Sequence, residues 1–184
     1  MTHWRWIPNA LTFMRILLVI PFAWSLANDQ YRPALLLFFI AAATDGLDGF
    51  LARFCGWKTR LGAIADPLAD KLLMITAFLM LSLTDVLPMW LFLLVLGRDL
   101  VIVGGGLLFH RVIGPFDVEP SILGKLNTLV QIVALLAVML AEADIAMPSE
   151  TQHVAVLTVA AMALLSGIHY VGTWGLRALR SRAS

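Results

Sequence analysis

Long apolar segments separated by short polar breaks constrain this chain more than any other feature. In chain order the apolar segments are Leu11–Ala27, Arg32–Arg53, Asp66–Leu83, Pro88–Phe109, Ile122–Ala141 and His153–Leu176. Each comes close to the roughly 20 residues that a helix needs to cross the hydrocarbon core of a bilayer. The pattern predicts an all-α integral membrane protein with six transmembrane helices. Residues 1–184 then form a single membrane domain and leave no room for a second, soluble one.

The composition excludes several classes of protein. Hydrophobic residues make up 60% of the chain, charged residues 14%, and the mean hydropathy is +0.88. Soluble domains average roughly 45–50% apolar and about 25% charged residues, so a soluble enzyme and a disordered chain are both excluded. A net charge of +1 gives no reason to expect a nucleic-acid partner. The single cysteine, Cys55, cannot form an internal disulfide.

The basic residues predict the orientation of the chain in the membrane. With six spans, one face receives both termini and the breaks at 54–61 and 110–121. That face holds Arg5, Arg15, Lys58, Arg60, Arg111, Arg177, Arg180 and Arg182. The opposite face holds Arg32 and the acidic residues Asp29, Asp85, Glu142, Asp144 and Glu150. By the positive-inside rule, both termini are expected in the cytoplasm.

The first apolar segment has an alternative interpretation. Arg15, the apolar run 16–22 and the small residues near Ala27 resemble a secretory signal peptide with its cleavage site. The aromatic residues Trp4, Trp6 and Phe13 before or beside Arg15 instead favour an interfacial segment that leads into a retained span.

Charged residues inside the predicted spans are the most informative positions. Seven that lie inside or at the edge of a span are Asp45, Asp48, Asp66, Asp70, Lys71, Arg98 and Asp99. Each ionised group there costs several kcal/mol unless it is paired, hydrated or bound to metal. On a helix, one stripe would contain Asp45, Asp48, Gly49 and Arg53, and a second would contain Gly62, Asp66 and Asp70.

Two facing stripes of this kind would gather up to four negative charges. Such a cluster requires either protonated carboxyl groups or cations between the carboxylates, and oxygen ligands suit Mg²⁺ or Mn²⁺. Four carboxylates can hold two ions, an arrangement that clamps a phosphoryl group. Arg53 is suited to phosphate contact. A simpler interpretation explains only one of the four carboxylates: Asp66 would cap a helix that begins at Pro67.

The motif residues resemble a known family. The segment Asp45-Gly-Leu-Asp48-Gly49-Phe-Leu-Ala52-Arg53, then eight residues, Gly62, three residues, Asp66, three residues and Asp70 is similar to the complete signature of the CDP-alcohol phosphatidyltransferases. The resemblance implies transfer of a phosphatidyl group from CDP-diacylglycerol to an alcohol, with release of CMP, in a homodimeric six-helix protein. It also implies that Asp45, Asp48, Asp66 and Asp70 hold two metal ions.

The resemblance also implies roles for single residues. Asp70 is the expected general base on the acceptor hydroxyl. Gly49 and Arg53 would contact the cytidine diphosphate, and Gly62 would leave room for the nucleotide. The chemistry would occur at the cytoplasmic leaflet, expected to be that of a bacterial inner membrane, with the lipid tails in the bilayer.

The sequence does not decide which acceptor alcohol the enzyme uses. We predict that Arg98, Arg111 and Lys125, together with Lys71, bind an acceptor phosphate. In the family such basic residues serve phosphorylated acceptors. The residue pairs Arg98-Asp99 and Asn127-Thr128 lean toward cardiolipin synthases, which use phosphatidylglycerol, whereas the short chain suits enzymes that use glycerol 3-phosphate. The sequence supports the two acceptors almost equally, and we take glycerol 3-phosphate as the first candidate.

Three alternatives accompany these assignments. Arg98 could form a structural pair or bind between helices, although Asp99 projects about 100° away from it on a helix and would be a poor partner. Arg111 and Lys125 could simply mark the cytoplasmic side. The acidic cluster could serve a divalent-cation transporter, but a cation path does not require Gly49, Arg53 and Gly62 in register with the carboxylates.

Overall fold

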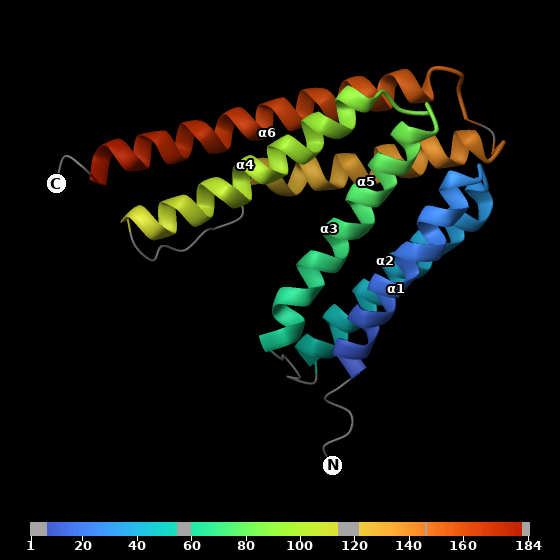
Figure 1. The fold of residues 1–184 in the computed structure, drawn as a ribbon, viewed down its shortest axis with the longest axis horizontal. Helices are drawn as coiled ribbons and strands as arrows, with labels where there is room; N and C mark the ends of the chain where they lie inside the picture. Colours follow the sequence, from blue (N-terminus) through green and yellow to red (C-terminus); the bar gives the residue numbers. More distant parts are fainter. Residues whose placement is uncertain (1–6, 55–59, 114–121, 146, 182–184) are drawn as a thin grey trace, which may run out of the picture. The chain divides into compact units, whose positions relative to one another are not determined.

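The computed structural model describes the backbone of residues 7–54, 60–113, 122–145 and 147–181, and the side chains of residues 10, 12–44, 65–105, 122–145 and 147–173. All regular structure in these ranges is α-helical (Figure 1). The helices are α1 Ile7–Ala27, α2 Tyr31–Phe54, α3 Arg60–Leu83, α4 Met89–Ile113, α5 Ile122–Glu142 and α6 Thr151–Ser181. Each predicted apolar segment therefore forms a helix, and the all-α fold is confirmed.

The start of α3 corrects one boundary. The helix begins at Arg60 rather than at Asp66, so Asp66 lies inside it and Pro67 is an interior residue. A proline fits the first helical turn best because it lacks an N–H group, and this preference was the basis of the alternative in which Asp66 caps the helix. The alternative in which Asp66 caps the helix is therefore wrong.

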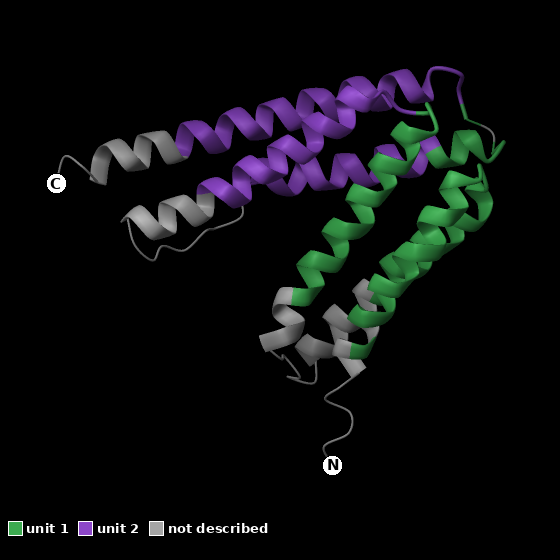
Figure 2. Cartoon of the chain, in the orientation of Figure 1, with its two compact units in different colours: residues 1–86, 139–147 green, residues 87–138, 148–184 purple. Residues whose placement is uncertain are grey.

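The chain forms two compact units, which are described separately (Figure 2). Unit 1 comprises residues 1–86 and 139–147. In it, α1 packs against both α2 and α3. Phe22 of α1 and Phe38 of α2 bring their ring centroids within 6.0 Å, and Phe78 of α3 is also buried. Because α1 contacts two helices, it is placed to position side chains on both.

Unit 2 comprises residues 87–138 and 148–184, and its main helix contact is between α4 and α6. Leu91 and Val95 of α4 are buried, as are Val159 and Ala163 of α6. An apolar cavity of about 600 Å³ lies between these helices, lined by residues that include Leu93, Val101 and Ile168.

Aspartates terminate several helices in unit 1. Asp29 and Asp144 follow the ends of α1 and α5 with φ angles of 56° and 57°. In each case the next residue donates its N–H back into the helix: Gln30 to the Ser25 carbonyl at 2.8 Å, and Ile145 to the Leu140 carbonyl at 3.1 Å. Helices commonly end this way, usually with glycine in the left-handed position. These acidic residues therefore end helices, in addition to any influence on the orientation of the chain in the membrane.

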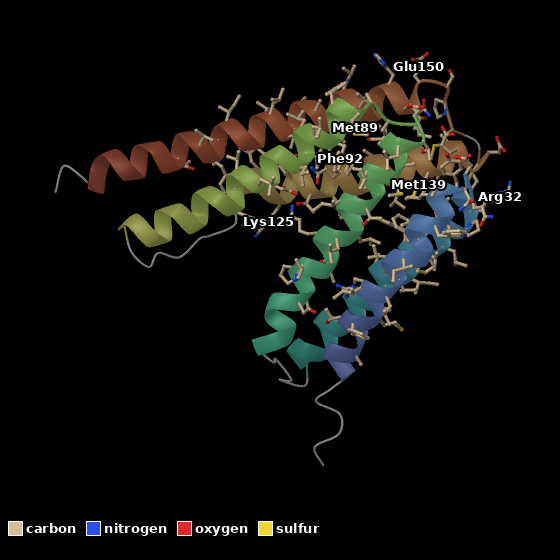
Figure 3. All side chains as sticks on the ribbon, in the orientation of Figure 1. Arg32, Met89, Phe92, Lys125, Met139 and Glu150 are labelled. Carbon is tan, nitrogen blue, oxygen red and sulfur yellow. The ribbon has the colours of Figure 1, made fainter. Side chains whose placement is uncertain are left out.

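Arg32 has a related local role. It is the basic residue predicted on the acidic face of the protein, and it is labelled in Figure 3. Its Nε donates a hydrogen bond of 3.2 Å to the carbonyl of Ala143, just after the end of α5. A cation at a helix C-terminus is favourable because the last carbonyls lack partners within the helix.

Two of the described helices are long and apolar enough to cross a membrane, over Ile122–Glu142 and Thr151–Thr173. Shorter apolar helical segments cover Thr12–Ala27 and Tyr31–Thr44. Large apolar side chains are exposed, among them Ile20 at 69%, Trp24 at 71% and Ile168 at 70%. In water such surfaces mark contact with a membrane or a partner.

Candidate metal and substrate site

The signature residues lie on two neighbouring segments of helix. Asp45, Asp48, Gly49 and Arg53 fall in the last three turns of α2, and Gly62, Asp66 and Asp70 fall in the first three turns of α3. Helical backbone over both motifs is what each one-face stripe requires. The side chains of Asp45, Asp48, Arg53 and the surroundings of Gly49 and Gly62 lie outside the described residues.

Asp66 and Asp70 are contacted from α1. The hydroxyl of Thr12 donates a short hydrogen bond to Oδ1 of Asp66. One turn further along α1, Nη1 of Arg15 donates to Oδ1 of Asp70 over 2.9 Å. Both donors are enclosed, since Thr12 is 2% and Arg15 0% exposed. Two successive turns of α1 thus hold two successive carboxylates of α3.

The side chain of Asp70 is accessible as well as hydrogen-bonded. Its side chain is 50% exposed, although its partner Arg15 is fully buried. Lys71, the next residue, is partly buried. Asp70 therefore combines a fixed position with access for a ligand, as both a metal ligand and a general base require.

The donor set fits a hard divalent cation. Carboxylate oxygens are the ligands that Mg²⁺ and Mn²⁺ prefer, and Asp66 and Asp70 present them one helical turn apart. Among the described side chains there is no group of three or more residues that could hold a metal ion. The four-carboxylate cluster remains a prediction because the side chains of Asp45 and Asp48 are outside that set.

Arg98 has a different environment from the one expected. Its Nη1 donates to Oδ1 of Asp99 over 2.8 Å, so the sequence-based view that Asp99 would be a poor partner is wrong. The long arginine side chain turns to reach its neighbour, which a helical angle alone does not reveal. Its Nη2 donates a short bond to the hydroxyl of Ser166 on α6. The guanidinium carbon lies 5.8 Å from the ring centroid of Tyr170.

The Arg98 network supports the structural alternative for this residue. The Arg98 and Asp99 side chains are 8% and 10% exposed, and the network joins α4 to α6 inside unit 2. The pair gives each enclosed charge an opposite partner, although Nε of Arg98 is buried and has no hydrogen-bond partner among the described residues.

The other predicted acceptor residues are less enclosed or lie outside the described set. Lys125 is exposed and extends from α5 (Figure 3). The side chain of Arg111 is outside the described residues. Convergence of Arg98, Arg111 and Lys125 near Lys71 is untested, because Lys71 belongs to unit 1 and the other three to unit 2.

Thr12 and Arg15 were not predicted as residues of this site. Arg15 was counted as a marker of the cytoplasmic side, and Thr12 was noted only as part of the stretch 8–15, which resembles the N-terminal stretch of the glycerophospholipid branch of the family. The available signal was their spacing of three residues on one helical face, with a charged member inside an apolar segment. Sequence could not identify their partners, which lie 54 and 55 residues away.

Comparisons with known proteins cover most of the chain. The family model for CDP-alcohol phosphatidyltransferases matches residues 5–171. A relative from Aquifex aeolicus named CDP-diacylglycerol--glycerol-3-phosphate 3-phosphatidyltransferase is 38% identical over 136 residues, which cover 72% of this chain and 74% of the relative. A probable phosphatidylglycerophosphate synthase from Mycobacterium tuberculosis is 36% identical over 182 residues, 94% of this chain and 81% of the relative.

A third relative carries a different name. A probable CMP-forming cardiolipin synthase from Drosophila melanogaster is 34% identical over 145 residues, which cover 70% of this chain but 45% of that protein. Three findings point to the same family. They are the signature on α2 and α3, the enclosed contacts to Asp66 and Asp70, and the family match over residues 5–171. The chain therefore belongs to the CDP-alcohol phosphatidyltransferase family of membrane-integral enzymes.

Proposed function

We propose that this enzyme transfers the phosphatidyl group of CDP-diacylglycerol to a hydroxyl of glycerol 3-phosphate and releases CMP. The observation that carries this choice is the coverage of the relatives. Those named for glycerol 3-phosphate or phosphatidylglycerophosphate match over 74% and 81% of their length, whereas the cardiolipin synthase matches over 45%. The family match favours this chemistry over divalent-cation transport.

Phosphatidylglycerol is the second candidate acceptor. It is supported by the 34% identity to the Drosophila cardiolipin synthase and by the residue pairs Arg98-Asp99 and Asn127-Thr128. Both acceptors present a hydroxyl and a phosphate, so both suit the same kind of basic pocket.

The catalytic residues are assigned by the signature. Asp45, Asp48, Asp66 and Asp70 would hold two Mg²⁺ or Mn²⁺ ions, and Gly49, Arg53 and Gly62 would accommodate the cytidine diphosphate. When bound, the ions neutralise charge on the diphosphate. Asp70 accepts the proton of the acceptor hydroxyl. The hydroxyl oxygen bonds to the phosphatidyl phosphorus, the bond from that phosphorus to the bridging oxygen breaks, and CMP leaves.

We assign the acceptor phosphate to Lys125, Arg111 and Lys71, and to Arg98 only through an exchange of its present bonds. Lys125 is the most accessible of the described residues in this group, because it is exposed whereas Arg98 is enclosed. For Arg98 to contact a phosphate, its bond to Asp99 or Ser166 would have to be exchanged for one to the ligand.

In the membrane, we propose six spans, cytoplasmic termini and an active site at the cytoplasmic leaflet of a bacterial inner membrane, in a homodimer. The exposed apolar side chains and the distribution of basic residues support this arrangement. A reporter fused after Ser184 should be active in the cytoplasm, and activity on the opposite side would contradict the topology. Cross-linking in native membranes should trap a dimer.

The decisive assay uses purified protein, CDP-diacylglycerol and Mg²⁺ or Mn²⁺, with glycerol 3-phosphate or phosphatidylglycerol as acceptor. We expect CMP release with glycerol 3-phosphate and little with phosphatidylglycerol. The reverse result would establish the second candidate acceptor. Absence of CMP release with either acceptor would contradict the proposed function.

A further inference from the structure

Two enclosed residues of α1 contact two predicted metal ligands of α3. Thr12 and Arg15 are one turn apart on α1, and Asp66 and Asp70 are one turn apart on α3. The contacts run in parallel, from the Thr12 hydroxyl to Asp66 and from the Arg15 guanidinium to Asp70. All four residues belong to unit 1, in which α1 packs directly against α3.

Arg15 approaches Asp70 from the protein interior. It is 0% exposed, while the Asp70 side chain is 50% exposed. The bond of 2.9 Å involves Oδ1 of Asp70, whose side chain is still half accessible. An arginine keeps its charge at any physiological pH and cannot compete as a base. It can therefore orient the carboxylate without taking part in proton transfer.

Thr12 acts on Asp66 in the same way without a charge. Its hydroxyl is a donor with one proton, and that proton is directed to Oδ1 of Asp66. A hydrogen bond to one oxygen restricts rotation of the carboxylate and keeps the other oxygen available. Partners of metal ligands commonly act in this manner, and their removal typically lowers metal affinity about 10–100-fold.

We propose that Thr12 and Arg15 are positioning residues for the divalent-metal site, holding Asp66 and Asp70 in the geometry that binds the cation. This inference rests on the proposed function of Asp66 and Asp70 as metal ligands. It assigns to α1 a role in the site in addition to its packing in unit 1. Neither residue touches the reacting atoms in this proposal.

The direction in which cation affinity changes when Arg15 is replaced tests the proposal. If Arg15 were only a positive charge near the site, its removal would strengthen cation binding by reducing repulsion. If it positions Asp70, its removal weakens cation binding despite that gain. The measurement is Mn²⁺ affinity of the purified full-length protein without substrates, by calorimetry or by the electron paramagnetic resonance signal of free Mn²⁺.

Matched variants separate positioning from packing. Thr12→Val removes the hydroxyl at nearly constant shape, and Thr12→Ser retains it. Arg15→Gln removes the charge, and Arg15→Lys retains it. We expect Thr12→Val and Arg15→Gln each to weaken Mn²⁺ binding about 10–100-fold. The Ser and Lys variants should recover most of the affinity.

Folding and the proposed function are checked in parallel. Size-exclusion profiles and melting temperatures without metal identify variants that do not fold, and the Thr12 pair decides the question if Arg15→Gln fails. Asp66→Asn should also weaken Mn²⁺ binding. Unchanged binding there would contradict the metal assignment itself. Weakened binding in Asp66→Asn, with wild-type or tighter binding in Thr12→Val and Arg15→Gln, would overturn only the positioning role.

Discussion

Each unit of the molecule contains an enclosed arginine paired with an aspartate, and the two pairs differ in how they face a ligand. In unit 1, Arg15 of α1 is 0% exposed and pairs with Asp70 of α3, whose side chain is 50% exposed. In unit 2, Arg98 and Asp99 are adjacent in sequence and are 8% and 10% exposed. The first pair is open on one side, and the second is enclosed on both.

The difference indicates which charged residues in an apolar chain are available for chemistry. In the open pair the Asp70 side chain is half exposed while Arg15 holds it from the protein interior, as the proposed role of Asp70 requires. In the enclosed pair, Asp99 and Ser166 engage both terminal nitrogens of Arg98. The contacts of Arg98 are therefore those of a structural pair, whereas Asp70 is both paired and accessible.

The largest expected effect is at the open pair. Asp70→Asn should lower kcat about 10²–10⁴-fold, because the amide cannot accept the proton of the acceptor hydroxyl. The amide oxygen can still accept the hydrogen bond from Arg15, so the protein should remain folded. Initial rates of CMP release measure the first effect and melting temperature the second. A kcat within a few fold of wild type would remove Asp70 as the base.

Substitutions in the enclosed pair of Arg98 and Asp99 should lower the free energy of unfolding. Arg98→Met should destabilise unit 2 by about 3–5 kcal/mol, because it leaves the Asp99 carboxylate enclosed without its cation. Denaturant unfolding in detergent micelles measures this change. The double variant Arg98→Met with Asp99→Asn should recover much of the loss. Equal stability of Arg98→Met and wild type would show that the pair does not support the contact between α4 and α6.

Ser166 tests the remaining bond of the same network. Ser166→Ala should cost about 1.5–3 kcal/mol, the usual range for a hydrogen bond to a charged group. Thr158→Ala is a suitable control on α6, because Thr158 is exposed and its hydroxyl bonds only within its own helix to the Val154 carbonyl at 2.7 Å. Equal losses of unfolding free energy in both variants would argue against a specific contribution of Ser166.

Substitution of Lys125 should have the smallest effect, and that effect should be confined to binding of the acceptor. Because Lys125 is exposed, Lys125→Gln should change stability by less than about 0.5 kcal/mol. Loss of one charged contact to the acceptor phosphate should raise KM for glycerol 3-phosphate about tenfold. The KM for CDP-diacylglycerol is the internal control. An unchanged acceptor KM would leave Lys125 as a marker of membrane orientation.

The sequence predicted each helix and placed the signature residues on helices. Helices α1, α2, α4 and α5 match the predicted segments closely, because long apolar runs and the breaks between them are local signals. The start of α3 and the end of α6 differ most from the predicted segments: α3 begins at Arg60, with Pro67 inside it, and α6 continues to Ser181. Boundaries depend on interactions that offset the lost backbone hydrogen bond of a proline, and these are not visible in the local pattern.

The sequence by itself therefore determined the membrane-protein class, the helices and the candidate metal ligands, because composition, hydrophobic length and motif spacing are properties of short stretches of chain. Only the tertiary structure decided how the enclosed arginines are used. Arg15 meets Asp70 across 55 residues because α1 packs on α3. Arg98 reaches Ser166 because α6 packs on α4, and it pairs with the adjacent Asp99 on its own helix. Packing between helices selects the partner of a long charged side chain, and with it the side of the carboxylate that remains open.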